Sequence, residues 1–253
     1  MEYVNVLGVK VSKVDYQSAI EIIEGFLLDG ENHYVVTPNP EFIVLAQKDS
    51  EFRRILNRAD LAIPDGVGLG VGTRVTGTDL MIKLCRRAAQ KGYSVFLLGG
   101  RGGVAAAAAK RLKDQFAGLN VVGTCEADPE GVLPAPPSLD DDRQIKDLQL
   151  PSSSRSRPID FLFVAYGAPK QEKWIAKNID KIPVKVAMGV GGAFDFIAGK
   201  KKRAPLALRR LGLEWFWRLI QEPRRLPRIL RATIKFPLLV FLHKLKAPVE
   251  TGD

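Results

Sequence analysis

A single carboxylate, Asp65, stands where a buried strand should end and could therefore meet a ligand. It follows the apolar run Leu61–Ile63, with Pro64 directly before it and Gly66 directly after it. Proline withdraws a backbone donor and glycine permits a tight turn, so the chain should leave the sheet at this point. A carboxylate in that place either caps the next helix or faces a ligand.

Polar side chains also follow two further apolar runs. In "TPNP", Thr37 and Asn39 lie at the end of a predicted strand, where they could hydrogen-bond to a polar ligand. The alternative is turn chemistry, with Asn39 as the N-cap of a helix that starts at Pro40. In "GVGGAFDF", Asp195 could cap a helix or bind a ribose or a base.

The stretch "YGAPKQEKW" places Gln171 directly after another predicted strand. An amide both donates and accepts hydrogen bonds, so Gln171 is the best candidate in this stretch for contacting sugar hydroxyls. Its neighbours Lys170, Glu172 and Lys173 are expected to form a solvated first helical turn.

A glycine-rich loop, "LLGGRGGVA", lies between a predicted strand and a predicted helix. It has the pattern G-x-G-x-x-A at Gly100, Gly102 and Ala105, preceded by Gly99. Glycines there let the backbone approach a pyrophosphate, whose charge a helix N-terminus stabilises. An ordinary turn has the same pattern, and the loop suits a dinucleotide as well as a UDP. Because Glu126 could be the ribose-binding acid of a dinucleotide enzyme, an NAD(P)-dependent oxidoreductase is the rival interpretation.

Strands and helices alternate along the chain, which predicts an α/β fold with a mostly parallel, doubly wound sheet. Ligands bind such sheets at the carboxyl ends of the strands, where the polar residues described above would converge. The expected strands are 33–40, 60–66, 93–100, 120–125, 159–167 and 184–191, and the expected helices are 40–59, 77–92, 103–116 and 170–180.

The composition divides the chain into a sheet domain at 1–199, an appendage of short helices at 200–246 and a tail at 247–253 that we expect to be disordered. Residues 126–157, rich in Pro, Ser and Asp, are expected to be an exposed insertion. Residues 200–235 contain twelve Lys or Arg and two acids, whereas the whole chain has a net charge of +10. Such a basic segment suits the phosphates of a nucleic acid, an anionic membrane or a pyrophosphate substrate.

Other kinds of site are not expected. The chain has two histidines, and it shows no metal-ligand spacing. Two isolated cysteines, Cys85 and Cys125, fit a reducing cytosol better than a disulfide scaffold. We see no signal-peptide pattern and no apolar run of about eighteen residues that could span a bilayer.

Seven motifs carry a resemblance to a known family. They are "TPNPEF", "IPDGVGL", "RVTGTDL", "FLLGG", "YGAPKQEKW", "GVGGAFDFIAGKKKRAP" and "GLEWFWRLIQEPRRL". In this order they resemble the bacterial WecG/TagA/CpsF glycosyltransferases, over residues 1 to about 228. The resemblance implies a single Rossmann-like domain with a membrane-proximal appendage, and no catalytic metal or other cofactor.

The implied reaction is an inverting transfer from a UDP-sugar to GlcNAc linked to undecaprenyl diphosphate. The sugar would be N-acetylmannosamine, a related N-acetylhexosamine or its uronic acid, and the product would serve teichoic acid or other surface-polysaccharide synthesis. Asp65 matches the family's proposed general base, which removes the acceptor hydroxyl's proton as that oxygen attacks the anomeric carbon. The family's donor-binding positions match Thr37, Asn39 and Gln171, and its nucleotide region matches Gly99, Gly100 and Asp195. Arg74 would either contact a phosphate or brace the loop.

The basic appendage would then meet an anionic lipid diphosphate at an anionic membrane surface. The candidates for that contact are Arg203, Arg218, Arg224 and Arg225. We expect a cytoplasmic protein, peripheral on the inner face of the plasma membrane. The contiguous aromatic run 215–217 cannot be buried on one helix face, so at least one ring should meet lipid or another copy, which leaves a homo-oligomer open. The aromatic, proline-broken tail argues against a nucleic-acid partner.

Overall fold

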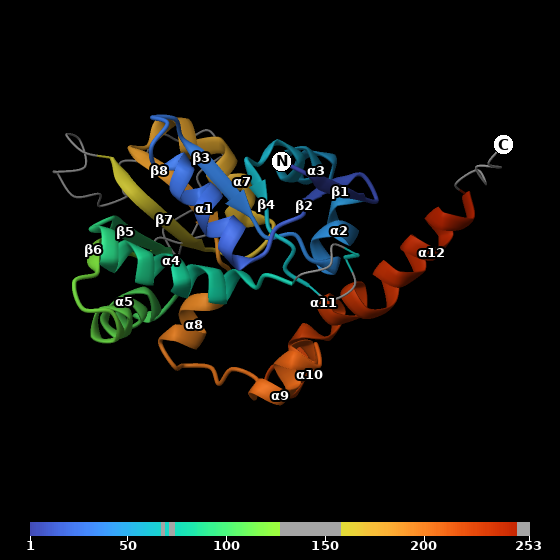
Figure 1. Ribbon diagram of the computed structural model, residues 1–253. Coiled ribbons are helices and arrows are strands. Elements are labelled where there is room, and N and C mark those ends of the chain that lie inside the picture. The colour runs from blue at the N-terminus through green and yellow to red at the C-terminus, as the bar shows by residue number, and fades with distance from the viewer. Residues whose placement is uncertain (67–68, 71–73, 127–157, 247–253) are drawn as a thin grey trace, which may run out of the picture.

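The computed structural model describes residues 1–66, 69–70, 74–126 and 158–246. The predicted insertion, apart from Glu126, and the predicted disordered tail lie outside the described residues. The rest forms a parallel sheet with helices on both faces and a C-terminal row of short helices (Figure 1).

The central sheet has six strands in the order β4-β3-β8-β7-β5-β6, and every neighbouring pair is parallel. The expected α/β fold with a parallel sheet is therefore confirmed. Each strand falls within a range predicted from the sequence: β3 (His33–Val36), β4 (Leu61–Ala62), β5 (Ser94–Gly99), β6 (Asn120–Cys125), β7 (Ile159–Ala165) and β8 (Val184–Gly189).

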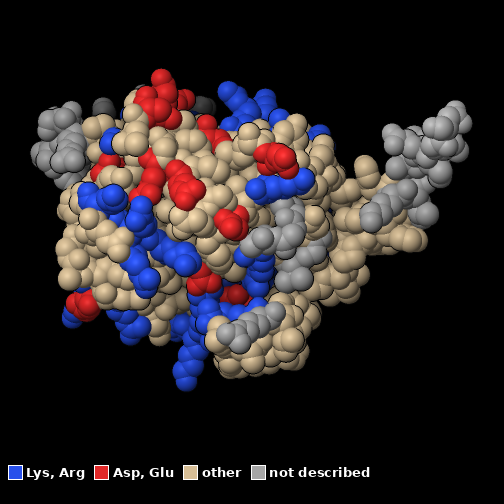
Figure 2. All heavy atoms as spheres, viewed as in Figure 1, with Lys and Arg blue, Asp and Glu red and all other residues tan. Residues whose placement is uncertain are grey.

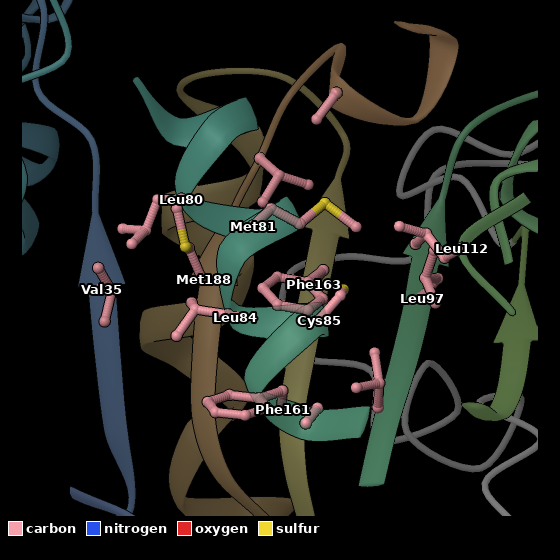
Figure 3. Close-up of a cluster of buried hydrophobic side chains, with 14 of the residues drawn as sticks. Val35, Leu80, Met81, Leu84, Cys85, Leu97, Leu112, Phe161, Phe163 and Met188 are labelled. Carbon is pink, nitrogen blue, oxygen red and sulfur yellow. The ribbon is translucent and has the colours of Figure 1, made fainter. Parts of the chain in front are cut away.

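One face of the sheet is covered by α1 (Tyr16–Phe26), α4 (Gly77–Lys91) and α5 (Val104–Gln115), with the short α8 (Ala193–Ile197) at its edge. Figure 3 shows the side chains of α4 lying over Phe161, Phe163 and Met188 of β7 and β8. Each fully buried side chain of this kind contributes roughly 1.5–3 kcal/mol. This packing fixes α4, and with it the first turn of α4 beside Asp65.

The other face is covered by α2 (Pro40–Ala46), α3 (Ser50–Arg58) and α7 (Lys170–Asn178), which continues into a 3₁₀ turn, η2 (Ile179–Lys181). The sequence pattern suggested one helix over 40–59, but the chain forms two. The break has a local cause, because the Asp49 side chain accepts a hydrogen bond from Phe52 N at 2.9 Å and starts α3 as its N-cap.

Three elements near the N-terminus had no counterpart in the predictions. Residues 1–32 contain an antiparallel hairpin of β1 (Tyr3–Val6) and β2 (Val9–Ser12), followed by α1. The hairpin packs on α2 and α3 through buried valines, and Ser12 Oγ at the end of β2 accepts a hydrogen bond from Ala62 N, the last residue of β4, at 3.2 Å.

The C-terminal row runs through α9 (Leu206–Arg210), α10 (Glu214–Gln221), η3 (Pro223–Arg225), α11 (Leu226–Leu230), the π-helical η4 (Arg231–Lys235) and α12 (Phe236–Lys246). Short proline-punctuated helices were expected here, and Pro223 and Pro227 both lie in the first turn of a new element. Figure 1 shows that the row passes below α2. It also shows that α12, the last helix of the row, projects from the body. Among the described residues, no helix is both long and apolar enough to cross a membrane.

Candidate active site

A two-part cleft lies between the carboxyl ends of the strands and the C-terminal helices. Its inner cavity, about 250 Å³, is bounded by the segments that follow β3, β7 and β8. Its outer cavity, about 390 Å³, is bounded by α2, the start of α4 and the C-terminal helices. The residues that line both are Asn39, Asp65, Thr78, Arg218, Arg225 and Arg228. The convergence predicted from the sequence is thus present for four strand ends, because Asp65, just beyond β4, lines the inner cavity as well.

Asp65 lies at the junction of the two cavities. Beyond the end of β4 its backbone N–H donates to Pro38 O at 3.0 Å, which ties it to the segment after β3. Its Oδ2 accepts a hydrogen bond from Gly77 N at 3.1 Å, at the first residue of α4. The expected contact with the next helix is therefore present, and the side chain also lines the cleft; that it faces a ligand stays a prediction.

The surroundings of Asp65 favour its protonated form more than water does. Desolvation raises the pKa of this carboxyl above its usual value, against the opposing influence of the Gly77 N–H and the positive charges of Arg74 and Arg218. A raised pKa makes the carboxylate a stronger base once it is ionised.

Thr37 and Asn39 line the cleft from the segment after β3. Thr37 is buried against the inner cavity. Asn39 is the N-cap of α2, as expected, because its Oδ1 accepts from Phe42 N at 3.0 Å with Pro40 as the first helical residue. The cap fixes the Asn39 side chain at the mouth of both cavities.

Gln171 lines the inner cavity but is only 2% exposed. Its Oε1 accepts hydrogen bonds from Gly167 N and from Gly191 N, each at 3.0 Å. Its Nε2 donates to Glu172 Oε1 at 2.7 Å. These three bonds leave one amide hydrogen of Gln171 for a ligand.

Glu172 contradicts the expectation of a solvated first turn in α7. It is 1% exposed, and burial raises the pKa of its carboxyl to about 7. The helical period carried this signal, because Glu172 lies three and seven residues before the buried Ile175 and Ile179 and so shares their face.

Three arginines of the C-terminal row reach both cavities. Arg218 stacks on Phe196 with 4.9 Å between guanidinium and ring centroid, and its buried Nε has no protein partner. Arg225 pairs with Glu222, and Arg228 Nε donates to Glu41 Oε1 at 2.8 Å. Arg218 and Arg225 were predicted site residues. Arg228 was not, because nothing in its spacing separates it from its basic neighbours.

Two other predicted cations, Arg203 and Arg74, line the outer cavity. Both form ion pairs near the junction between the C-terminal helices and the body. Arg203 pairs with Asp79 at 2.5 Å, and Arg74 Nη2 lies 3.3 Å from Glu214 Oε2. Glu214 also lies 3.4 Å from Arg218 and is 7% exposed. Figure 2 shows Lys and Arg intermixed with acids where α9 and α10 meet the body.

The remaining predicted site residues lie at the margin of the cleft or outside it. Asp195 lines the inner cavity and lies 3.5 Å from Lys201. Arg224 is not brought to the cleft and lines a separate surface hollow with Gln221 and Pro223.

Gly99 and Gly100 are not among the residues that line either cavity. A Cβ at Gly99 would stand 2.9 Å from the ring of Tyr166, so this glycine permits close packing of the segment after β7. Among the described residues, no group of three or more His, Cys, Asp or Glu is placed to hold a metal ion.

Comparison with known proteins assigns the chain to a family. The model of the glycosyl transferase WecG/TagA/CpsF family matches residues 4–249. The chain belongs to this family. A relative from Bacillus spizizenii strain W23 is 33% identical over 239 residues, covering 90% of this chain and 87% of its own length. A relative from Staphylococcus aureus strain MRSA252 is 30% identical over 237 residues, covering 89% and 87%.

Both relatives carry the name N-acetylglucosaminyldiphosphoundecaprenol N-acetyl-beta-D-mannosaminyltransferase. Family membership confirms the resemblance drawn from the motifs, and it gives no support to the oxidoreductase alternative. The glycine loop on which that alternative rested also stays outside the lining of both cavities.

Proposed function

We propose that this glycosyltransferase transfers N-acetylmannosamine from a UDP-sugar to N-acetylglucosaminyldiphosphoundecaprenol, with inversion at the anomeric carbon. The names of the relatives support the acceptor and the transferred sugar. The observation that carries the proposal is that one carboxylate, Asp65, faces both an inner and an outer cavity.

In the proposed step Asp65 removes the proton of the acceptor hydroxyl. The freed oxygen bonds to the anomeric carbon while the bond from that carbon to UDP breaks, and the nucleotide leaves with the electron pair. Gly77 N–H holds Oδ2, which leaves Oδ1 for the acceptor proton. General-base catalysis of this kind contributes about 10²–10⁴-fold to the rate.

We assign the donor sugar to the inner cavity, because ligands of parallel sheets bind at the carboxyl ends of the strands. Thr37, Asn39 and Gln171 line this cavity, which supports their assignment to the donor. The outer cavity, open toward the C-terminal helices, then takes the acceptor.

Arg218, Arg225 and Arg228 lie between the two sites and can bind diphosphate oxygens. A guanidinium forms paired hydrogen bonds with phosphate and can stabilise the charge of departing UDP without a metal. The basic residues are thereby assigned to small-molecule diphosphates rather than to nucleic acid.

We also propose peripheral attachment to the cytoplasmic face of an anionic membrane, where a lipid-linked acceptor resides. Exposed large apolar side chains follow one another along the C-terminal row: Trp215, Phe216, Ile220, Leu226, Leu230, Ile234, Leu238, Phe241 and Leu242. In Figure 2 the visible face of this row is mostly uncharged. An exposed apolar patch of this extent favours contact with lipid.

A transfer assay tests the reaction. The full chain is incubated with UDP-N-acetylmannosamine and a synthetic GlcNAc-diphosphate lipid, with and without EDTA, and products are identified by mass spectrometry. We expect the lipid-linked disaccharide and UDP in equal amounts in both samples. Failure to form disaccharide, with saturable NADH binding instead, would overturn the proposal. UDP-N-acetylglucosamine and the uronic acid of the donor serve as competing donors.

A further inference from the structure

The buried pair Gln171 and Glu172 joins two loops of the inner cavity. Gly167 belongs to the segment between β7 and α7, and Gly191 to the segment between β8 and α8. Both loop N–H groups donate to the same oxygen, Gln171 Oε1, at 3.0 Å. One side-chain carbonyl therefore bridges the two loops.

This bridge works in one orientation of the Gln171 amide. The carbonyl and NH₂ ends of an amide have nearly the same shape, so hydrogen-bond partners decide which end points where. If the group turned over, NH₂ would face the two loop N–H groups and both would lose their acceptor. An acceptor on the opposite side of the amide prevents this, and Glu172 Oε1, 2.7 Å from Gln171 Nε2, is that acceptor.

The pair fits only because a glycine lies beside it, and its burial leaves one carboxyl oxygen without a partner. Gly189 ends β8 beside it, and a Cβ there would lie 2.6 Å from Gln171 Nε2 and 3.0 Å from Glu172 Oε1. Glu172 itself is 1% exposed, and its Oε2 has no protein partner. Burying a carboxyl group with one unsatisfied oxygen opposes folding, so Glu172 is kept at a cost in stability.

We propose that Glu172 is a positioning residue for sugar transfer: by accepting from Gln171 it fixes that amide, and so holds the two loops at the separation the donor requires. The structural half of this inference concerns the loops alone. Its consequence for the donor rests on the proposed function.

Amide hydrogen exchange and donor binding test the two halves separately. We expect Glu172→Leu, which fills the space without an acceptor, to speed exchange at the Gly167 and Gly191 N–H groups at least tenfold. Glu172→Gln, which can present an amide oxygen to Gln171, should restore protection. Gly189→Ala, which displaces the pair from the other side, should act like Glu172→Leu. Asn178→Leu, at the far end of α7, is the matched control for removing a buried polar group.

In binding assays with UDP-N-acetylmannosamine, Glu172→Leu should raise the donor Kd about tenfold, through the same loops. Combined with Gln171→Leu, it should add nothing further, because Glu172 acts through Gln171. Unchanged exchange at both glycines in Glu172→Leu and in Gly189→Ala, or additive effects on Kd, would overturn the inference. If exchange in the variants changes as expected while the wild-type protein binds no UDP-sugar, the role of Glu172 in holding the two loops is supported and the proposed function fails.

Discussion

Asp65 and Glu172 are two carboxyl groups of one cleft whose surroundings give them different roles. Asp65 opens onto both cavities and contacts one helix N–H, so it can receive a proton from a substrate. Glu172 lies behind the cavity wall, where it contacts the Gln171 amide. Burial raises the pKa of both groups, but only one can touch the reacting atoms.

The raised pKa of Glu172 makes folding stability depend on pH. The folded protein holds this proton up to about pH 7, whereas the unfolded chain releases it near the ordinary pKa of a glutamate, 4.5. The folded state therefore binds more protons in this window, and this group's contribution to stability falls as pH rises through it. Arg228, which lowers the pKa, is the charged group acting on Glu172.

We predict that Glu172→Gln removes this loss. Between pH 5 and pH 8, its stability relative to the wild type should rise by an amount on the order of 3 kcal/mol. Urea denaturation at both pH values measures the difference, with Glu31→Gln, an exposed carboxyl, as control. If the stabilities of the wild type and Glu172→Gln change in parallel with pH, the pKa of Glu172 is not raised in the folded protein.

Residues differed in how far the sequence could place them. Asp65 and Asn39 were placed by their neighbours, because proline and glycine mark where a strand ends and a helix starts. Glu172 could have been placed by helical period, but its charge suggested a solvated turn. Arg228 could not, because its role depends on where Glu41, far away in sequence, lies in the fold.

At the scale of elements, the sheet was predictable and the ends of the chain were less so. All six strands lie within ranges expected from the sequence, and the nearly continuous apolar run of β5 is typical of a strand covered on both faces. The β1–β2 hairpin was missed although its signal is present, because valines alternate with polar residues over 4–6 and 9–11 on either side of a Leu-Gly turn. The single predicted helix over 40–59 failed because capping by Asp49 outweighs helical periodicity there.

Glu214 joins the C-terminal row to the body at the start of α10. Its ion pairs with Arg74 and Arg203, at 3.3 and 3.7 Å, reach residues outside the row, whereas its pair with Arg218, at 3.4 Å, lies within α10. Breaking a fully buried ion pair costs about 3–5 kcal/mol, and the partial exposure of these arginines reduces that value. Loss of the Glu214 charge should therefore loosen α9 and α10 locally rather than unfold the sheet.

We predict that Glu214→Gln increases the rate of tryptic cleavage within α9 and α10 several-fold while the melting temperature of the sheet domain changes little. Limited proteolysis followed by mass spectrometry locates the cuts. Glu2→Gln, which breaks the exposed pair with Lys13, is the control. Cleavage at the wild-type rate would show that Glu214 does not hold the row.

At the scale of the whole molecule, the positive charge and the apolar surface gather on the same C-terminal row. Arginines of the row turn inward to the cleft, and large apolar side chains remain exposed. A donor arriving from solution and an acceptor arriving from a membrane could then meet at Asp65 from different sides.

We predict that the full chain floats with vesicles containing phosphatidylglycerol and that Phe216→Ser, Ile220→Ser and Phe241→Ser together abolish flotation. Each apolar side chain fully buried in lipid contributes roughly 1.5–3 kcal/mol, so three changes should suffice. High salt should weaken binding by screening the cationic contribution. Leu28→Ser, equally apolar but on the body, is the control and should float normally. Flotation of the triple variant at the wild-type level would refute the assignment.

The most direct measurement is single-turnover transfer by Asp65→Asn with donor binding determined on the same sample. The account predicts a rate about 10²–10⁴-fold below the wild type with an unchanged donor Kd, since the amide keeps the shape but cannot take the proton. Asp60→Asn, at the start of β4, is the matched control and should keep the wild-type rate. Turnover of Asp65→Asn within a few-fold of the wild type would contradict the central claim that this carboxylate deprotonates the acceptor.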